Sequence, residues 1–355
     1  MLGKLVAPKY EDEITKHWKY TDKTYISVIC ITYNHGDYLT EAIESFLAQK
    51  SEYKFEIIIH DDASIDNTTS ILKAIARKYP TIIKPIYNAE NQYSQNVNLP
   101  ISNCNSLAKG DYIAFCEGDD YWIDEYKLQR QIKFLEKHHQ YGLVLTDYHN
   151  YDQSTQAVKY NLISSNLEQR LSRLNFESFL TYFGYFAPMT WLVRSDLWHE
   201  VTNHNEQHLD GTFVWLLKVL KISQVKVLTN ATAVHRLLPE SASHSNNVEK
   251  LLTRNESLLE TQMWFHQEYK LDPSLIEQFL KVHFLLNINT VASRKITRGA
   301  LFKVLTSFKF SYLSSMSKMQ ILSLISVFIP LPNKIKIMIN NSVRSIKNQK
   351  VNQDR

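Results

Sequence analysis

DYIAFCEGDDYW, residues 111–122, is a short apolar run that ends in a tight group of acids. The letters YIAFC have the length and β-forming composition of a strand buried on both faces of a parallel sheet. Such a strand would carry Glu117, Asp119 and Asp120 to the carboxyl edge of the sheet, where they repel one another unless a cation or a proton offsets their charge. Mg²⁺ and Mn²⁺ prefer carboxylate oxygens, so the group favours a divalent metal site. The alternative is an acidic turn that caps a helix beginning near Asp124.

The composition is that of a folded protein: 355 residues, 44% hydrophobic, 21% charged, with a net charge of +4. This length allows one large core with an appendage, or two domains. The three cysteines have neither metal-ligand nor disulfide spacing, and residues 1–18 contain no apolar signal segment, so we expect a reducing compartment without secretion. None of the eight glycines builds a dinucleotide-binding or P-loop motif. A nucleotide would therefore be bound through side chains and a metal.

Further apolar runs precede the acids. We predict buried strands over YISVICIT (25–32), FEIIIH (55–60) and residues 82–87, and a helix from about residue 124 to 138. Repeated strand-then-helix units imply a parallel sheet with right-handed crossovers. In such a sheet the ligand site lies beyond the carboxyl ends of the strands. Asp61-Asp62 and Glu117–Asp120 both follow strands, so we expect these two acidic groups to converge on one cleft, although either alone is often only a helix cap.

Three blocks of the chain resemble the family 2 glycosyltransferases, which use nucleotide sugars and have the GT-A fold. They are ISVICITYNHGDYLTEAIESFLAQ, FEIIIHDDASIDNTTSIL and AKGDYIAFCEGDDYWIDEYKLQRQIKFLE, in the family's order and at its separations. The resemblance covers roughly residues 25–245. It implies an α/β fold with a Rossmann-like, mostly parallel sheet flanked by helices.

The resemblance also implies roles for residues at the carboxyl edge. Asp62 matches the acid that contacts the nucleotide base, and uridine is the expected base. The Thr32–Asn34 segment, which includes Tyr33, matches the loop around the nucleoside, and Ser64 belongs to the same expected donor site. Glu117-Gly118-Asp119 matches the D-x-D motif that holds Mn²⁺ or Mg²⁺ on the donor diphosphate. Glutamate replaces the first aspartate here, which makes Asp119 the surer ligand.

Farther along, the resemblance implies a base and a phosphate contact. Asp210 matches the acid that deprotonates the acceptor, but it is also a good N-cap for a helix over residues 211–221. Glu206 is the next acid to consider as the base. Arg236 matches the segment that closes over the donor phosphates. The usual residues after it are missing, and His244 is a possible substitute.

These assignments imply an inverting sugar transfer from a nucleotide sugar, expected to be a UDP-sugar, to a glycan or polyprenyl-linked acceptor in cell-surface polysaccharide synthesis. Two alternatives stay open. A protein without a base would bind a nucleotide sugar or glycan without turnover. A nucleotidyltransferase would also place acids at strand ends, but it usually carries a glycine-rich activating loop that is missing from this sequence.

We divide the chain into a lead-in (1–24), a glycosyltransferase domain with donor (25–140) and acceptor (141–247) halves, and a helical C-terminal region (248–355). From Arg294 onward the tail has twelve basic residues and one acid, interleaved with apolar residues. The apolar run Met319–Leu331 is too short to span a membrane. We expect the tail to bind the inner face of the cell membrane peripherally. A helical appendage packed on the enzyme is the alternative, and no motif supports nucleic-acid binding.

Overall fold

The computed structural model describes residues 2–202, 210–238 and 247–292, together with Lys309, Tyr312 and Ile321. The chain forms two compact units. The first comprises Met1–Leu167, Tyr185–Gln207 and Trp215–Leu237, and the second comprises Glu168–Gly184, His208–Val214 and Leu238–Arg355. The expected division after residue 247 remains a prediction: the second unit includes residues from Leu238 onward, among them helix α10 (Val248–Glu268), and two earlier segments.

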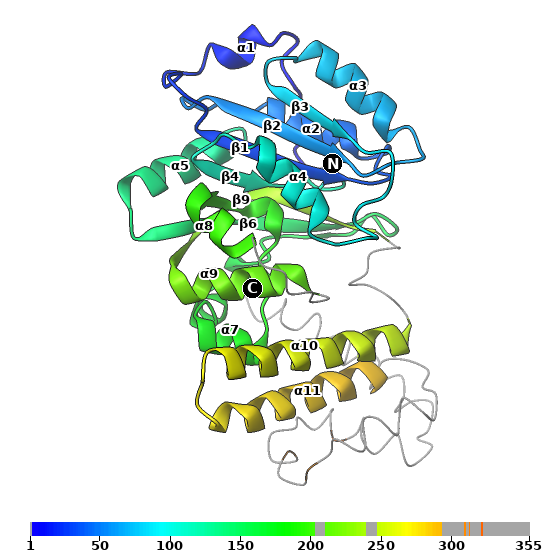
Figure 1. Cartoon of the computed structure of the whole chain (residues 1–355), viewed down its shortest axis with the longest axis vertical. Helices are drawn as coiled ribbons and strands as arrows, with labels where there is room; N and C mark the ends of the chain where they lie inside the picture. Colours follow the sequence, from blue (N-terminus) through cyan, green and yellow to red (C-terminus); the bar gives the residue numbers. More distant parts are fainter. Residues whose placement is uncertain are drawn as a thin grey trace. The chain divides into compact units, whose positions relative to one another are not determined.

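The first unit is built on a sheet whose N-terminal half is parallel (Figure 1). The strands lie in the order β3 (Ile83–Tyr87), β2 (Phe55–Asp61), β1 (Ile26–Thr32) and β4 (Tyr112–Phe115). Every residue of β2 is buried, and so is every residue of β1 except Ile31, as expected for strands covered on both faces. The helices that follow along the chain are α2 (Leu39–Leu47), α3 (Thr68–Lys78), α4 (Leu99–Leu107) and α5 (Lys127–Lys137). The predicted α/β fold is confirmed.

The other half of the sheet is mixed. Beyond β4 the order continues through β8 (Leu192–Arg194), β6 (Tyr141–Asp152), β9 (Gln224–Leu237) and β5 (Tyr121–Trp122), and β7 (Val158–Lys159) pairs with β6. β8 runs antiparallel to β4, and β5 runs antiparallel to β9. The acids therefore lie in a short connection between two strands of one sheet. The helix expected from residue 124 begins only at Lys127, because residues 121–122 extend as β5.

Short helices complete the first unit and extend into the second. They are α1 (Asp12–Thr15), η1 (Ser164–Asn166), α6 (Leu167–Ser172), α7 (Phe176–Tyr182), η2 (Pro188–Thr190), α8 (Ser195–Thr202) and α9 (Gly211–Ile222). The second unit also contains α10 and α11 (Ser274–Ala292), which lie side by side (Figure 1).

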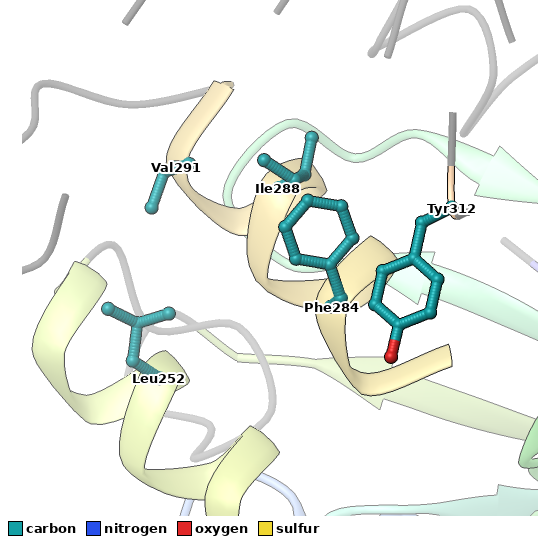
Figure 2. Close-up of a cluster of buried hydrophobic side chains, with 5 residues drawn as sticks. All are labelled: Leu252, Phe284, Ile288, Val291 and Tyr312. Atoms are coloured by element: carbon teal, nitrogen blue, oxygen red, sulfur yellow. The ribbon is translucent and has the colours of Figure 1, made fainter. Parts of the chain in front are cut away.

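A buried apolar cluster joins α10 and α11 to a residue of the tail (Figure 2). Leu252 comes from α10, and Phe284, Ile288 and Val291 come from α11. The ring of Tyr312 lies 5.4 Å from that of Phe284 and is 2% exposed. At this position the tail packs against α11, within the second unit.

The tail makes a second described contact through Lys309, whose Nζ lies 2.6 Å from a carboxylate oxygen of Glu277. The rest of residues 294–355, apart from Tyr312 and Ile321, lies outside the described residues, as do Glu206 and His244. Among the helices that the structure describes, none combines the length and the apolar character needed to cross a bilayer.

Candidate active site

The loops that follow β1 and β2 are bonded to each other at the carboxyl edge of the sheet. The backbone N–H of Asn34 donates to Oγ of Ser64 (2.9 Å), and Oδ1 of Asn34 accepts from the backbone N–H of Ile65 (2.9 Å). Asn34 and Ala63 both have left-handed backbones, with φ of 55° and 64°. Asparagine tolerates this conformation better than most residues because its short side chain bonds locally. The structure therefore brings the predicted nucleoside residues from the two loops together.

The neighbouring residues Thr32 and Tyr33, at the carboxyl end of β1, differ in their exposure to solvent. The side chain of Thr32 is buried and its Oγ1 has no hydrogen-bond partner within the described part of the chain. Tyr33 is 42% exposed. A buried hydroxyl without a partner is uncommon in folded proteins and often marks a place for water, an ion or a ligand. An exposed ring beside it provides a flat apolar surface of the kind on which a nucleotide base stacks.

Asp62 is buried, with 1% of its surface exposed, and its carboxylate accepts backbone bonds from the next loop. The N–H of Gln92 donates to Oδ1 (2.8 Å) and that of Tyr93 donates to Oδ2 (2.9 Å). Asn88 adds a longer bond of 3.3 Å from its amide. Asp62 therefore holds the loop between β3 and α4, an arrangement that its sequence position did not predict. The asparagine-rich composition of residues 88–98 is the signal that could have pointed to it.

Glu117, Asp119 and Asp120 can place one carboxylate oxygen each within 4.8 Å of one another. The predicted pair of metal ligands is thus joined by Asp120, which is buried, whereas Asp119 is half-buried and Glu117 is exposed. Although Glu117 is exposed as a residue, desolvation of its carboxyl group, followed by the charge of Asp119, raises its pKa to about 7. Burial, followed by the charges of Asp119 and Glu117, raises the pKa of Asp120 well above its usual range. A cation bound to these oxygens would offset this repulsion.

Gly118 allows the acids to approach the β1 loop. Its N–H donates to the carbonyl of Ile31 (3.0 Å), and a Cβ at this position would lie 2.8 Å from Oγ1 of Thr32 and 3.1 Å from Nδ1 of His35. Nδ1 of His35 is buried without a hydrogen-bond partner among the described residues and lies 3.9 Å from Oδ1 of Asp119. Only glycine fits at position 118, because a Cβ would come too close to these atoms. The close approach places Oγ1 of Thr32 and Nδ1 of His35 beside the acids. His35 was not among the predicted site residues, although it lies one residue beyond the Thr32–Asn34 segment.

Arg236 lies on β9 and is engaged by protein groups on all sides. Its Nε donates to the carbonyl oxygen of Asp119 (2.7 Å), and one terminal nitrogen donates to Oε2 of Glu41 (2.8 Å). Its other terminal nitrogen donates to Gln153 (3.2 Å). The structure thus places Arg236 next to the acids. Its expected contact with the donor phosphates remains a prediction.

Asp210 lies in the second unit, immediately before α9. Its Oδ1 accepts from the N–H of Phe213 (3.3 Å), and its Oδ2 lies 2.5 Å from a terminal nitrogen of Arg254. The first contact has the pattern of an N-cap, which was the alternative to a catalytic base. The carboxylate is still 22% exposed. Its predicted role as the base remains a prediction.

Residues 27–199 match the family model described as glycosyl transferase family 2. The putative glycosyltransferase EpsE of Bacillus subtilis is 42% identical over 121 residues, which cover 34% of this chain and 42% of EpsE. An Escherichia coli protein, the UDP-Glc:alpha-D-GlcNAc-diphosphoundecaprenol beta-1,3-glucosyltransferase WfaP, is 39% identical over 112 residues, 31% of this chain and 41% of WfaP. The chain thus spans less than half the length of these relatives.

Two solved structures have a similar fold over nearly the whole chain. S. aureus TarS 1–349 in complex with UDP-GlcNAc aligns with a TM-score of 0.58 and 19% identity, covering 92% of each chain. The mannosyltransferase PcManGT from Pyrobaculum calidifontis, in complex with GDP-Man and Mn²⁺, aligns with a TM-score of 0.53 and 12% identity, covering 97% of this chain and 94% of PcManGT. At these identities the likeness concerns the fold alone. The family match therefore assigns residues 27–199 to glycosyl transferase family 2, and the likeness to the solved structures shows the GT-A fold.

Proposed function

We propose that this protein is an inverting glycosyltransferase that moves a sugar from a UDP-sugar to a glycan or polyprenyl-linked acceptor in cell-surface polysaccharide synthesis. The observation that carries the proposal is the convergence of the β1 and β2 loops with the acids after β4 at one edge of the sheet. Ligands of parallel α/β sheets bind at this edge. WfaP, by its name, transfers glucose from UDP-Glc to a diphosphoundecaprenol-linked sugar, and TarS binds UDP-GlcNAc.

The acids suit a hard divalent cation, Mn²⁺ or Mg²⁺. Three carboxylates, of which Glu117 and Asp120 have raised pKa values, lie close to Oγ1 of Thr32 and Nδ1 of His35, which have no hydrogen-bond partner within the described part of the chain. The charge of the acids is therefore not fully offset by the protein groups that the structure describes. Asp119 and Glu117 would hold the cation, with Asp120 beside them. When bound, a divalent cation supplies positive charge to the leaving diphosphate. The Mn²⁺ complex of PcManGT supports this choice of metal class.

In the proposed reaction, the residues of the chain bind, orient and accept a proton. Asp62 accepts the imide N–H of uracil, while Tyr33 and Asn34 enclose the nucleoside. Asp210 accepts the proton of the acceptor hydroxyl. The hydroxyl oxygen attacks the anomeric carbon as the bond from that carbon to the diphosphate breaks, so the configuration inverts without a covalent intermediate.

A screen of nucleotide sugars tests the proposal directly. The full-length protein is incubated with each donor, a panel of glycan and polyprenyl-linked acceptors, and Mn²⁺ or EDTA. We expect release of UDP with Mn²⁺, greatest with the matching acceptor, and none with EDTA. Tight binding of a UDP-sugar without UDP release across the panel would support the non-catalytic alternative.

Asp62→Ala is expected to weaken UDP binding by about 10- to 100-fold, because a hydrogen bond to a charged group contributes about 1.5–3 kcal/mol. Isothermal titration measures the affinity. Asp66→Ala is a matched control, since Asp66 lies in the same loop and also accepts backbone bonds, from Gly36 (3.0 Å) and Thr68 (2.9 Å). Unchanged UDP affinity in a folded Asp62→Ala variant would remove this residue from the site.

We also propose that the basic tail attaches the protein to the inner face of the cell membrane. The test replaces five basic residues near the C-terminus with glutamine: Lys334, Lys336, Arg344, Lys347 and Lys350. This variant keeps Lys309 and Tyr312, which contact α11. Each basic residue near an anionic surface contributes about 1 kcal/mol, so co-sedimentation with phosphatidylglycerol vesicles should fall by at least about 10²-fold in affinity. Equal co-sedimentation of variant and wild type would contradict the proposal.

A further inference from the structure

A row of ionic contacts runs from the N-terminal segment to the acids. Nζ of Lys4 lies 3.1 Å from Oε1 of Glu41 on α2, and Oε2 of Glu41 lies 2.8 Å from a terminal nitrogen of Arg236 on β9. Nε of Arg236 donates in turn to the carbonyl oxygen of Asp119 (2.7 Å). Lys4 is 46% exposed at its side chain, so its pair with Glu41 contributes little. Glu41 and Arg236 have exposed side-chain fractions of only 13% and 6%, and they form the buried part of the row.

The guanidinium of Arg236 has its position fixed from several directions. Its three nitrogens donate to Asp119, Gln153 and Glu41. Its carbon lies 4.8 Å from the ring centre of Tyr38 and 5.0 Å from that of Tyr121. A planar fork held by hydrogen bonds in its plane and by rings near it has little freedom to move. A buried arginine with these partners is therefore a rigid support for whatever it contacts.

Arg236 contacts the acidic connection at two successive residues. Its side chain bonds the carbonyl oxygen of Asp119, and its backbone N–H donates to Oδ1 of Asp120 (2.7 Å). Strand pairing adds a third restraint, because Tyr121 pairs with Val234 on β9. The backbone of the acids is thus fixed to β9 through a residue whose own position depends on Glu41.

We propose that Glu41 and Arg236 are positioning residues for the cation site: their buried ion pair fixes the backbone of Asp119 and the carboxylate of Asp120 so that the acids converge on one ion. The inference rests on the proposed metal site and gives Arg236 a role other than contact with the donor phosphates. Residues that orient metal ligands typically change metal affinity by about 10- to 100-fold when they are replaced.

If Arg236 acted on the cation site through its charge alone, the expected change in cation affinity of one variant would be opposite to the change expected from loss of positioning. Arg236→Gln removes a positive charge beside the acids, so long-range attraction alone would strengthen binding of a cation. Loss of positioning weakens it instead. Because Arg236 is buried, Arg236→Gln alone leaves Glu41 with Lys4, whose side chain is exposed, as its remaining ionic partner and risks misfolding. The double variant Glu41→Gln/Arg236→Gln leaves the net charge unchanged and removes both members of the buried ion pair.

The experiment measures Mn²⁺ binding to the full-length protein without nucleotide, from the electron paramagnetic resonance signal of free Mn²⁺. We expect about 10- to 100-fold weaker binding in Arg236→Gln and in the double variant, and about tenfold weaker binding in Glu41→Gln. Glu44→Gln is the matched control, since it makes the same change one turn along α2, and it should bind like wild type. Thermal melts establish that each variant is folded.

The outcomes separate the inference from the proposed function. Wild-type Mn²⁺ affinity, or tighter binding, in a folded double variant overturns the positioning role while leaving the metal site in place. A wild-type protein that binds no Mn²⁺ overturns both. With Mn²⁺ at saturation, Glu41→Gln should recover turnover, because its defect lies in metal affinity. A loss of turnover in this variant that saturating Mn²⁺ does not restore also overturns the inference.

Discussion

Replacing Asp210 by asparagine is expected to slow sugar transfer by about 10²- to 10⁴-fold, the usual contribution of a positioned general base. Folding and donor binding should survive, because asparagine caps a helix about as well as aspartate and keeps an oxygen for the N–H of Phe213. The lost ion pair with Arg254 should matter little, since that side chain is 39% exposed. Initial rates of UDP release and titrations with UDP measure the two effects separately.

The matched control separates catalysis from capping. Asn175 caps α7 with the same pattern, since its Oδ1 accepts from the N–H of Ser178 (3.0 Å). Asn175→Ala and Asp210→Ala should each lose about 1 kcal/mol of stability, but only the second should lose activity. An Asp210→Asn variant that transfers sugar at the wild-type rate would leave this residue as a cap, and the search for the base would move to Glu206.

Asp119→Ala is expected to abolish the Mn²⁺-dependent part of UDP binding and to reduce turnover by at least about 10²-fold. The physical reason is that a bound metal stabilises charge on the leaving diphosphate by several kcal/mol, and Asp119 is the surer of its two predicted ligands. UDP titrations with and without Mn²⁺ give the metal-dependent increment for each protein.

Asp111→Ala provides the control for the metal prediction. Asp111 lies at the other end of β4, exposed, with a carboxylate oxygen 2.6 Å from Nζ of Lys23. Its removal changes the net charge as Asp119→Ala does but takes no oxygen from the site. We expect the control to bind UDP as the wild type does. Equal, metal-independent UDP affinity in wild type and Asp119→Ala would contradict the metal site.

The parallel strands and the edge that holds the site were predictable because they depend on short-range patterns. Runs such as ISVICIT and FEIIIHD are apolar without alternation, which is the pattern of a strand covered on both faces. The polar residues that follow such a strand in the sequence lie at the carboxyl edge of the sheet. The acids after β4 and the loop residues after β1 and β2 therefore meet where the sequence predicts. Boundaries were less exact, as the late start of α5 illustrates, because pairing of β5 with β9 competes with helix formation.

Local sequence patterns could not predict the hydrogen-bond and ion-pair partners of individual polar side chains. Nothing near Asp62 in the sequence indicates that its carboxylate holds the backbone of Gln92 and Tyr93, because that contact depends on how the loop after β3 folds back. The same holds for Arg236 and Glu41, which are 195 residues apart and meet only because β9 joins the sheet beside β5.

Lys127 is a further example. It looks like an ordinary helix lysine, yet it is fully buried, with Nζ 2.8 Å from Oε1 of Gln131 and 4.3 Å from the ring centre of Trp122. Burial lowers its pKa to about 7.

The sequence by itself determined the α/β class, the parallel strands and the edge that carries the acids, since hydrophobic period and strand ends are local properties. Only the tertiary structure decided which polar groups are buried and what they bind, because desolvation and hydrogen bonding depend on neighbours brought from distant parts of the chain.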